Sequence, residues 1–177
     1  MKLRAMALAL TCNFCFLVPL FSWSSSDKDK AMLTVSIDSD RREYTLTQEV
    51  RLDVRVTNCG TEPLTIYGHL LWGDAGGLTL HITDESNKEI VSKLLDDDLL
   101  IPSTLLNRNS FVVLLPNHFL GTTRVGRTTD FFEKPGTYFI RAEYRSPVPS
   151  KFGQGPNFWS FDQPPVSSKP IQVHVSR

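Results

Sequence analysis

The stretch Lys134-Pro-Gly-Thr-Tyr-Phe-Ile-Arg-Ala-Glu-Tyr144 is the strongest local signature of the fold. Pro135 and Gly136 form a dipeptide that is typical of turns. After this turn, Tyr138, Ile140, Ala142 and Tyr144 occupy every second position, with Phe139, Arg141 and Glu143 between them. A period of two predicts a β-strand with one buried face.

The same period recurs along the chain. Its clearest instance runs from Glu49 to Asn58, where valines and a leucine alternate with charged residues and a threonine. Shorter alternating runs lie at 32–38, 78–82 and 171–175, and further strands are expected at 64–70, at 90–91 after a hairpin loop, and at 110–115, where a continuous apolar run predicts a fully buried strand. The segment 124–127 is ambiguous, and 94–106 could be a long loop or one helical turn.

About eight short strands and no convincing amphipathic helix predict an all-β domain. The stretch from Pro135 to Ala142 resembles the corner before strand F of immunoglobulin-like sandwiches, with Gly136 in the turn and Tyr138 at the position whose hydroxyl bonds back to the upstream backbone. Ile140 stands where antibody domains have a cysteine, so the resemblance is to disulfide-free members. We therefore expect an immunoglobulin-like, two-sheet antiparallel sandwich of about seven to nine strands without a disulfide.

The wider region 50–175 is similar to immunoglobulin-like domains of exported bacterial proteins. More loosely, its order of strand, polar turn and late Pro-Gly-Thr-Tyr strand is similar to bacterial proteinase-inhibitor sandwiches and to non-catalytic accessory domains of secreted hydrolases. This resemblance implies a binding or structural role, with proteinase inhibition and service as an accessory domain or subunit of a secreted enzyme as alternatives.

The N-terminus has the layout of a secretory signal. Lys2 and Arg4 precede the apolar run Ala5 to Phe21, and small residues at Ser22 and Ser24 would suit cleavage after Ser24. We expect a signal peptide at 1–24, with a retained membrane anchor as the alternative, a polar linker at 25–31 and the sandwich at 32–177. The protein is thus expected to be exported, to the periplasm or outside the cell.

Charge and cysteine content narrow the functional classes. The chain has 19 basic and 19 acidic residues in a mixed pattern, which argues against nucleic-acid binding and against membrane contact beyond the N-terminal segment. Cys12 and Cys15 lie in the signal, so Cys59 alone remains after cleavage and cannot form an internal disulfide. Cys59 is either a small turn residue or a reactive or intermolecular thiol.

No catalytic motif stands out. The sequence lacks a Gly-x-Ser-x-Gly elbow, a phosphate-binding glycine loop and a His-Glu-x-x-His pair. The histidines at 69, 81, 118 and 174 are dispersed, and the triplet Asp96 to Asp98 lacks the spacing of a calcium loop. The sequence therefore predicts neither enzyme activity nor a cofactor or metal site.

The long loop at 146–169 is the best candidate for recognition. It is rich in proline and glycine and carries four large aromatic residues, Phe152, Phe158, Trp159 and Phe161. Such side chains dominate binding interfaces, but in a long loop they also serve to pack the loop on its own domain. We expect a non-catalytic module of the cell envelope or secretome that recognises a protein or other macromolecule through its end loops.

Overall fold

A computed structural model describes residues 32–73, 77–90 and 107–177 of the chain. These residues form twelve strands, one helical turn, α1 (Thr128–Phe131), and short 3-10 turns. The strands are β1 (Leu33–Ser39), β2 (Glu43–Thr45), β3 (Glu49–Asn58), β4 (Leu64–Tyr67), β5 (Leu71–Trp72), β6 (Gly77–Asp84), β7 (Glu89–Ile90), β8 (Phe111–Leu114), β9 (Phe119–Arg127), β10 (Gly136–Tyr144), β11 (Val166–Ser167) and β12 (Ile171–Ser176).

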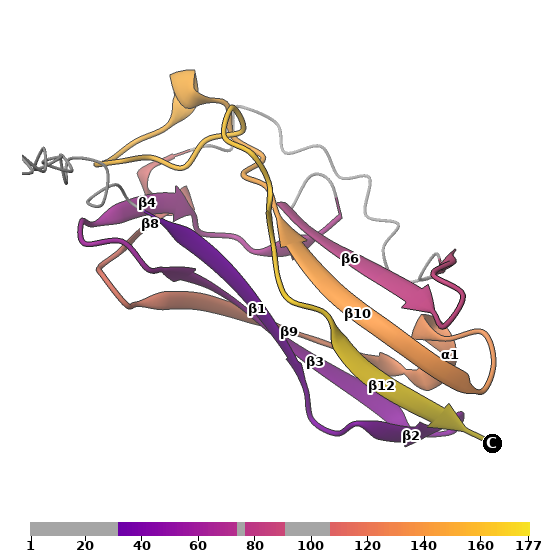
Figure 1. The fold of residues 1–177 in the computed structure, drawn as a ribbon. Helices are drawn as coiled ribbons and strands as arrows, with labels where there is room; N and C mark the ends of the chain where they lie inside the picture. Colours follow the sequence, from indigo (N-terminus) through magenta and orange to yellow (C-terminus); the bar gives the residue numbers. More distant parts are fainter. Residues whose placement is uncertain (1–31, 74–76, 91–106) are drawn as a thin grey trace, which may run out of the picture.

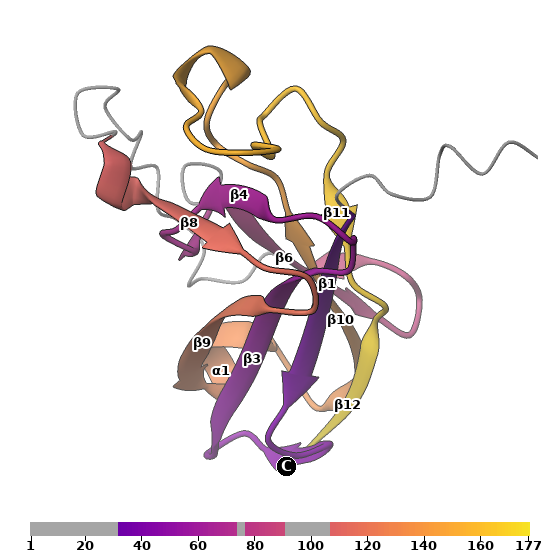
Figure 2. The same cartoon turned by 90° about the vertical axis from the view of Figure 1, so that its left-hand side faces the viewer.

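The strands form two facing layers (Figures 1 and 2). One layer has the order β1-β3-β9, and the other has the order β2-β12-β10-β6-β5, with β11 on β10 and β7 on β6. Strands β4 and β8 pair with each other as a separate two-stranded ribbon at one end. The expectation of an all-β sandwich is therefore confirmed.

The core lies between the two layers and follows the alternation of the sequence. In β3, Val50, Leu52, Val54 and Val56 are at most 1% exposed, while Arg51 and Arg55 between them face solvent. In β10 the same holds for Tyr138, Ile140, Ala142 and Tyr144. Burial of a side chain the size of valine or leucine contributes roughly 1.5–3 kcal/mol, so these two strands account for much of the stability.

The corner before β10 has the geometry that the tyrosine motif predicts. The hydroxyl of Tyr138 donates a hydrogen bond of 2.6 Å to the backbone oxygen of Lys134. Its ring packs on Phe132 with centroids 4.6 Å apart, just after α1. Gly136 opens β10, and an added Cβ there would lie 3.8 Å from the Tyr138 ring. The bond fixes the direction in which the chain enters β10, which is the central strand of its layer.

No disulfide joins any residues within the described ranges. Cys59 is exposed and free, and its sulfur lies 3.0 Å from the hydroxyl oxygen of Thr34. Cys59 follows β3 directly, as expected of a turn residue. The expected signal peptide, the aspartate triplet and the segment 94–106 lie outside the described residues.

The structure has more strands than the sequence indicates. Strands β2, β5 and β11 are two or three residues long, too short to display a period, whereas the strand expected at 90–91 is β7. Two of the pairings, β12 with β2 and β5 with β6, are parallel. The ambiguous segment 124–127 is the end of β9, whose pattern is weak because none of its residues is fully buried and its inner face carries Thr122, Arg124 and Gly126.

The apolar run at 110–115 is a strand, but the expectation that it is fully buried is wrong. Leu114 is buried, whereas Val113 and Leu115 are each 49% exposed. The reason is topological, because β8 pairs only with β4 and lies outside the two layers. The hydrophobic residues of β8 therefore have one face without a second sheet to cover it.

Candidate binding surface at the loop end

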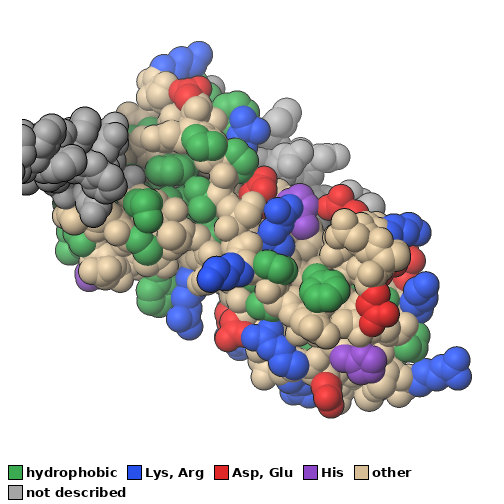
Figure 3. Space-filling model, viewed as in Figure 1, with side chains coloured by type: hydrophobic (Ala, Val, Ile, Leu, Met, Phe, Trp, Pro, Cys, Tyr) green, Lys and Arg blue, Asp and Glu red, His purple; other side chains and the backbone are tan. Residues whose placement is uncertain are grey.

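Hydrophobic side chains gather at the end of the sandwich that holds β4, β8 and the loop after β10. Figure 3 shows this concentration, and it shows charged side chains and histidines over the face formed by β10 and β12. We call the β4–β8 ribbon together with residues 145–168 the apolar end. A hydrophobic surface that the fold leaves uncovered is a common mark of an interaction site.

The loop is fixed to the ribbon through Thr65 in the middle of β4. The backbone N–H of Thr65 donates to the oxygen of Pro156 over 3.1 Å, and its hydroxyl donates to the same oxygen over 2.8 Å. The backbone N–H of Trp159 in turn donates to the oxygen of Thr65 over 2.9 Å. Since β8 pairs with the other edge of β4, this strand is bonded along both sides.

Two further contacts hold the loop in place. Gly155 has a φ of +96°, and a Cβ there would lie only 2.5 Å from the Thr65 hydroxyl oxygen, so a residue without a side chain is required. The side-chain amide of Asn157 donates to Glu62 over 2.8 Å and to the oxygen of Pro63 over 3.1 Å. The loop is therefore built into the fold, although its sequence is that of an irregular connection.

The four aromatic candidates divide into two pairs. Phe158 and Trp159 are half-buried and serve packing. The Phe158 ring meets Phe111 of β8 edge to face, with centroids 5.4 Å apart, and lies so close to Gly153 that a Cβ there would overlap it. Trp159 packs against the main core. These two residues anchor the loop.

Phe152 and Phe161 form the second pair and remain open to solvent, at 40% and 43% exposure. Each ring has a cation beside it: the guanidinium carbon of Arg145 lies 3.9 Å from the Phe161 centroid, and the ammonium of Lys151 lies 4.8 Å from the Phe152 centroid. Cation–π contacts of this kind restrict the rings without covering them completely.

Asp162 joins the two segments that carry the exposed rings. Its carboxylate accepts a hydrogen bond of 3.3 Å from the backbone N–H of Ser150. Hydrogen bonds from Ser150 and Ser160 hold the pKa of Asp162 below its usual range. The carboxylate is therefore ionised at neutral pH, and it links the start of the 3-10 turn Ser150–Phe152 to the segment that carries Phe161.

No sequence pattern indicates that β8 contributes to this surface. Val113 and Leu115 expose their side chains in and just after β8, and Phe111 of the same strand contacts Phe158 of the loop. The continuous apolar run concealed this, because a run without alternation reads as a strand buried on both faces. Trp72, which the sequence left between core and surface, is 6% exposed and belongs to the core.

Ionisable groups elsewhere show no converging cluster of metal ligands among the described residues. His81 is paired with Glu89 across the β6–β7 hairpin at 2.8 Å, and His174 lies 3.4 Å from the Thr137 hydroxyl. His118 is exposed, and the His69 ring lies 5.3 Å from Tyr67. Within the same ranges, no helix has the length and apolar character needed to cross a membrane.

No protein-family model and no curated protein matches this sequence. Among solved structures, the chain is similar to a CARDB domain from Pyrococcus furiosus, with 14% identity, 83% of this chain and 94% of that chain covered, and a TM-score of 0.40. It is similar also to a β-glucosidase from Erythrobacter marinus, with 13% identity and a TM-score of 0.41, covering 82% of this chain and 16% of the enzyme. The chain is similar as well to Spo0M, a sporulation control protein from Bacillus subtilis, with 11% identity and a TM-score of 0.43, covering 83% of this chain and 50% of Spo0M. The fold assignment rests on the sheets described above.

Proposed function

We propose that this protein is a non-catalytic binding module that recognises a macromolecular partner, most simply a protein, through the apolar end. The observation that carries this proposal is the pair Phe152 and Phe161, which the fold holds in place and leaves exposed. Val113 and Leu115 add exposed hydrophobic area in and just after β8, and the cations of Arg145 and Lys151 lie beside the two rings. Aromatic residues and arginine are enriched in protein interfaces.

The chemistry of the apolar end favours binding over catalysis. Its exposed groups are aromatic and aliphatic side chains with the cations of Arg145 and Lys151. The Asp162 carboxylate is already engaged with the loop backbone. Catalysis of hydrolysis or group transfer needs a nucleophile or an acid and base within reach of each other and of the substrate. The Ser160 hydroxyl and the Asp162 carboxylate lie 3.4 Å apart, but Ser160 is buried, so this pair is not presented to a substrate.

The test is a proximity-crosslinking experiment in a cell envelope extract, with quantitative proteomics on two double variants. In Phe152→Ser/Phe161→Ser the exposed rings of the apolar end are removed. In Leu71→Ser/Phe139→Ser, two hydrophobic side chains of similar exposure are removed from strands β5 and β10. The proposal expects a partner that is lost at least tenfold with the first variant and retained with the second. A partner list unchanged by the first variant would contradict it.

We also propose that the chain is exported and acts in the periplasm or outside the cell. This proposal is supported by the sequence of residues 1–24. Expression of the full chain with subcellular fractionation and N-terminal sequencing tests it. The expected product begins at Ser25 and lies outside the cytoplasm; an uncleaved chain in the membrane fraction would instead support a retained anchor, and a cytoplasmic chain would refute export.

A further inference from the structure

Strand β9 is an edge strand of nine residues that pairs with β3 on one side. Both ends of the pairing establish which backbone groups point toward β3. The N–H of Asn58 donates to the oxygen of His118, and the N–H of Thr128 donates to the oxygen of Gln48. Hydrogen-bonded positions alternate in an antiparallel ladder, so the even-numbered residues of β9 bond to β3.

The odd-numbered residues of β9 consequently direct their N–H and C=O groups away from β3. These are Phe119, Gly121, Thr123 and Val125; the N–H of Arg127 is taken by the Asp130 carboxylate at 2.8 Å. No other described backbone group bonds to these four residues. Figure 2 shows β9 at the margin of its layer. A long free edge of this kind is a template for pairing with another strand.

The outward side chains of this edge are hydrophobic at both ends. Phe119 is 54% exposed and Val125 is 47% exposed, on the solvent face of the layer. Common protections of an edge strand are proline, inward charges and short length. Strand β9 is nine residues long and contains no proline, so of these protections it has one inward charge, Arg124, on its inner face. The edge is thus both long and partly hydrophobic.

We propose that two copies of this chain associate by antiparallel pairing of β9 with β9 about a two-fold axis at Thr123. In this register Thr123 lies opposite Thr123 of the second copy and Gly121 lies opposite Val125. Every outward-facing group from Gly121 to Val125 then finds a partner, with two hydrogen bonds in each directly bonded pair. Two-fold dimers use the same patch on both subunits, so the edge has to be complementary to itself.

The side chains of β9 meet this condition. On the solvent face, Phe119 lies diagonally next to Val125 of the second copy. The two-fold axis repeats this contact, so each exposed hydrophobic residue of the strand gains one hydrophobic neighbour across the interface. On the other face, Thr122 lies opposite Arg124 and Leu120 opposite Gly126, which places no two charges of the same sign directly across from each other. Like charges in that position are destabilising. Because the side chains of β9 are complementary to those of a second β9, the strand that we expect at this edge belongs to a second copy of the chain and not to a foreign peptide.

The other edge of this layer is less open. The free side of β1 faces the segment Val166–Ile171 of the second layer across a groove of about 380 Å³. A strand arriving there would have to enter between two layers. At β9 the main contacts besides those with β3 are with α1, the turn that directly follows the strand. The asymmetry favours β9 as the pairing edge.

This dimer is independent of the role proposed for the apolar end, but it would change how that end operates. Strand β9 starts beside the ribbon and ends at α1. Antiparallel pairing therefore places the two apolar ends at opposite extremes of the dimer. The assembly would present two equivalent recognition surfaces pointing apart, so it could bridge two partners.

Disulfide trapping in the full chain tests the register, with all native cysteines replaced by serine. Residues in a directly bonded pair have Cα atoms about 5.5 Å apart, which is within disulfide range. Thr123→Cys is expected to form a covalent dimer under mild oxidation. Val125→Cys is the matched control, because its counterpart in the second copy lies four residues along the strand, about 13 Å away. No dimer with Thr123→Cys, or equal trapping at both positions, would overturn the register.

Light scattering with size-exclusion chromatography tests the association itself. The unmodified chain is expected to dimerise with increasing concentration, and Val125→Lys is expected to weaken dimerisation at least tenfold without a change in circular dichroism. Val113→Lys, at the similarly exposed position of β8, is expected to leave it unchanged. A chain that is monomeric up to ~100 µM, or a dimer lost with Val113→Lys and kept with Val125→Lys, would overturn the proposal.

Discussion

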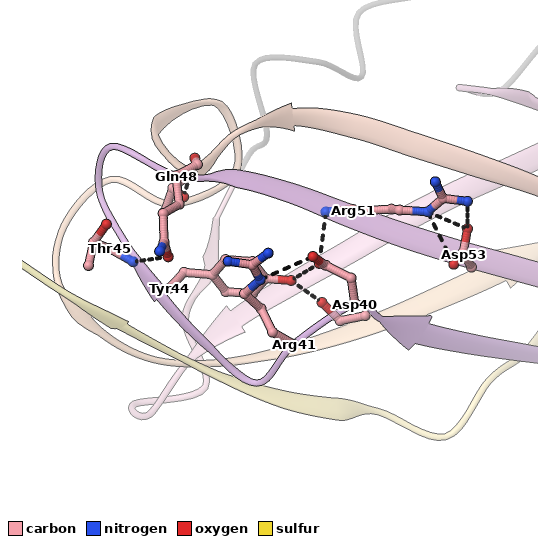
Figure 4. A network of polar contacts seen from close by, with 9 residues as sticks. Asp40, Arg41, Tyr44, Thr45, Gln48, Arg51 and Asp53 are labelled. Carbon is pink, nitrogen blue, oxygen red and sulfur yellow. Dashed lines mark hydrogen bonds and ion pairs between the residues drawn. The ribbon is translucent and has the colours of Figure 1, made fainter.

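The two ends of the sandwich differ in the side chains that they present. The apolar end exposes hydrophobic residues, whereas the opposite corner, where β1 leads into β2, is polar. At the β1–β2 corner polar side chains bond to one another (Figure 4). The hydroxyl of buried Tyr44 donates to Asp40 over 2.5 Å and contacts the hydroxyl of Ser39. The same carboxylate of Asp40 accepts from Arg41 at 3.1 Å and from the Arg51 N–H at 3.3 Å.

The Asp40 carboxylate at this corner already accepts hydrogen bonds from three donors of its own chain, so it is occupied within the fold. Desolvation of Asp40 acts to raise its pKa, but the hydrogen bonds from Tyr44, Arg51 and Arg41 outweigh it and hold the pKa below its usual value. At the apolar end, by contrast, backbone hydrogen bonds of Thr65, Trp159 and Phe161 hold the loop while Phe152 and Phe161 stay exposed. The first region stabilises the fold, and the second has surface left for a partner.

The sharpest way to separate the two regions is to remove one aromatic side chain from each. Tyr44→Ala deletes a ring that is 1% exposed and is expected to cost about 3–5 kcal/mol in the free energy of unfolding, as for other buried aromatic residues. Phe161→Ala is expected to change it by less than about 0.5 kcal/mol, as for exposed positions. Urea unfolding measures both; equal costs would contradict the division.

A backbone change tests whether the loop at the apolar end is truly docked. Gly155→Ala places a Cβ against Thr65 at a φ of +96°, and the strain is expected to cost about 1–3 kcal/mol. The neighbouring Gln154→Ala serves as control because residue 154 is exposed. Hydrogen exchange at the Trp159 amide, which bonds to Thr65, should accelerate in the first variant alone. Unchanged exchange in both variants would show that the loop tolerates the side chain.

At the polar corner, removal of one oxygen isolates the hydrogen bonds from the packing. Tyr44→Phe keeps the buried ring and loses the bonds to Asp40 and Ser39, at an expected cost of about 1–1.5 kcal/mol. The pKa of Asp40 should rise toward its ordinary value in this variant. NMR titration of the Asp40 carboxyl carbon measures that rise, and a pKa that did not move would mean that Tyr44 contributes nothing to it.

The smallest expected effect concerns pH. The pKa of Asp40 is lower in the folded than in the unfolded chain, so its stabilising contribution is fully present above the unfolded pKa of about 4 and is lost as the pH falls through the folded value. Asp40→Asn should therefore be less stable than the unmodified chain at pH 7, and the difference should shrink at acid pH. Unfolding curves at several pH values would show a constant difference if this reasoning failed.

The sequence was sufficient for the fold because the sandwich depends on alternation. The alternation in Glu49 to Asn58 and in Lys134 to Tyr144 predicts each strand and its buried face. The corner before β10 is predicted by Pro135, Gly136 and Tyr138. It was not sufficient for β2 or β9, since a three-residue strand shows no period and the inner face of β9 is only half-buried and includes Gly126 and Arg124. Local pattern also carries no information on which strands share a sheet.

The candidate surface was predicted only in part for the same reason. Composition drew attention to the four aromatic residues of the loop, but only tertiary contacts separate Phe158 and Trp159, which anchor it, from Phe152 and Phe161, which are exposed. Val113 and Leu115 were missed because their exposure depends on the ribbon leaving the two layers. Whether a side chain of β8 is exposed thus depends on which strand β8 pairs with, and not on its residue type.

The bonds from both sides of β4 also affect the thermodynamics of any association at the apolar end. A loop of more than twenty residues would ordinarily lose conformational entropy on binding, at a cost of roughly 1–2 kcal/mol for each residue that becomes ordered. Here Thr65, Gly155 and Trp159 already fix its path in the free protein. A partner would therefore meet a preorganised surface, and its association should proceed close to rigid docking, with rate constants that depend little on loop rearrangement.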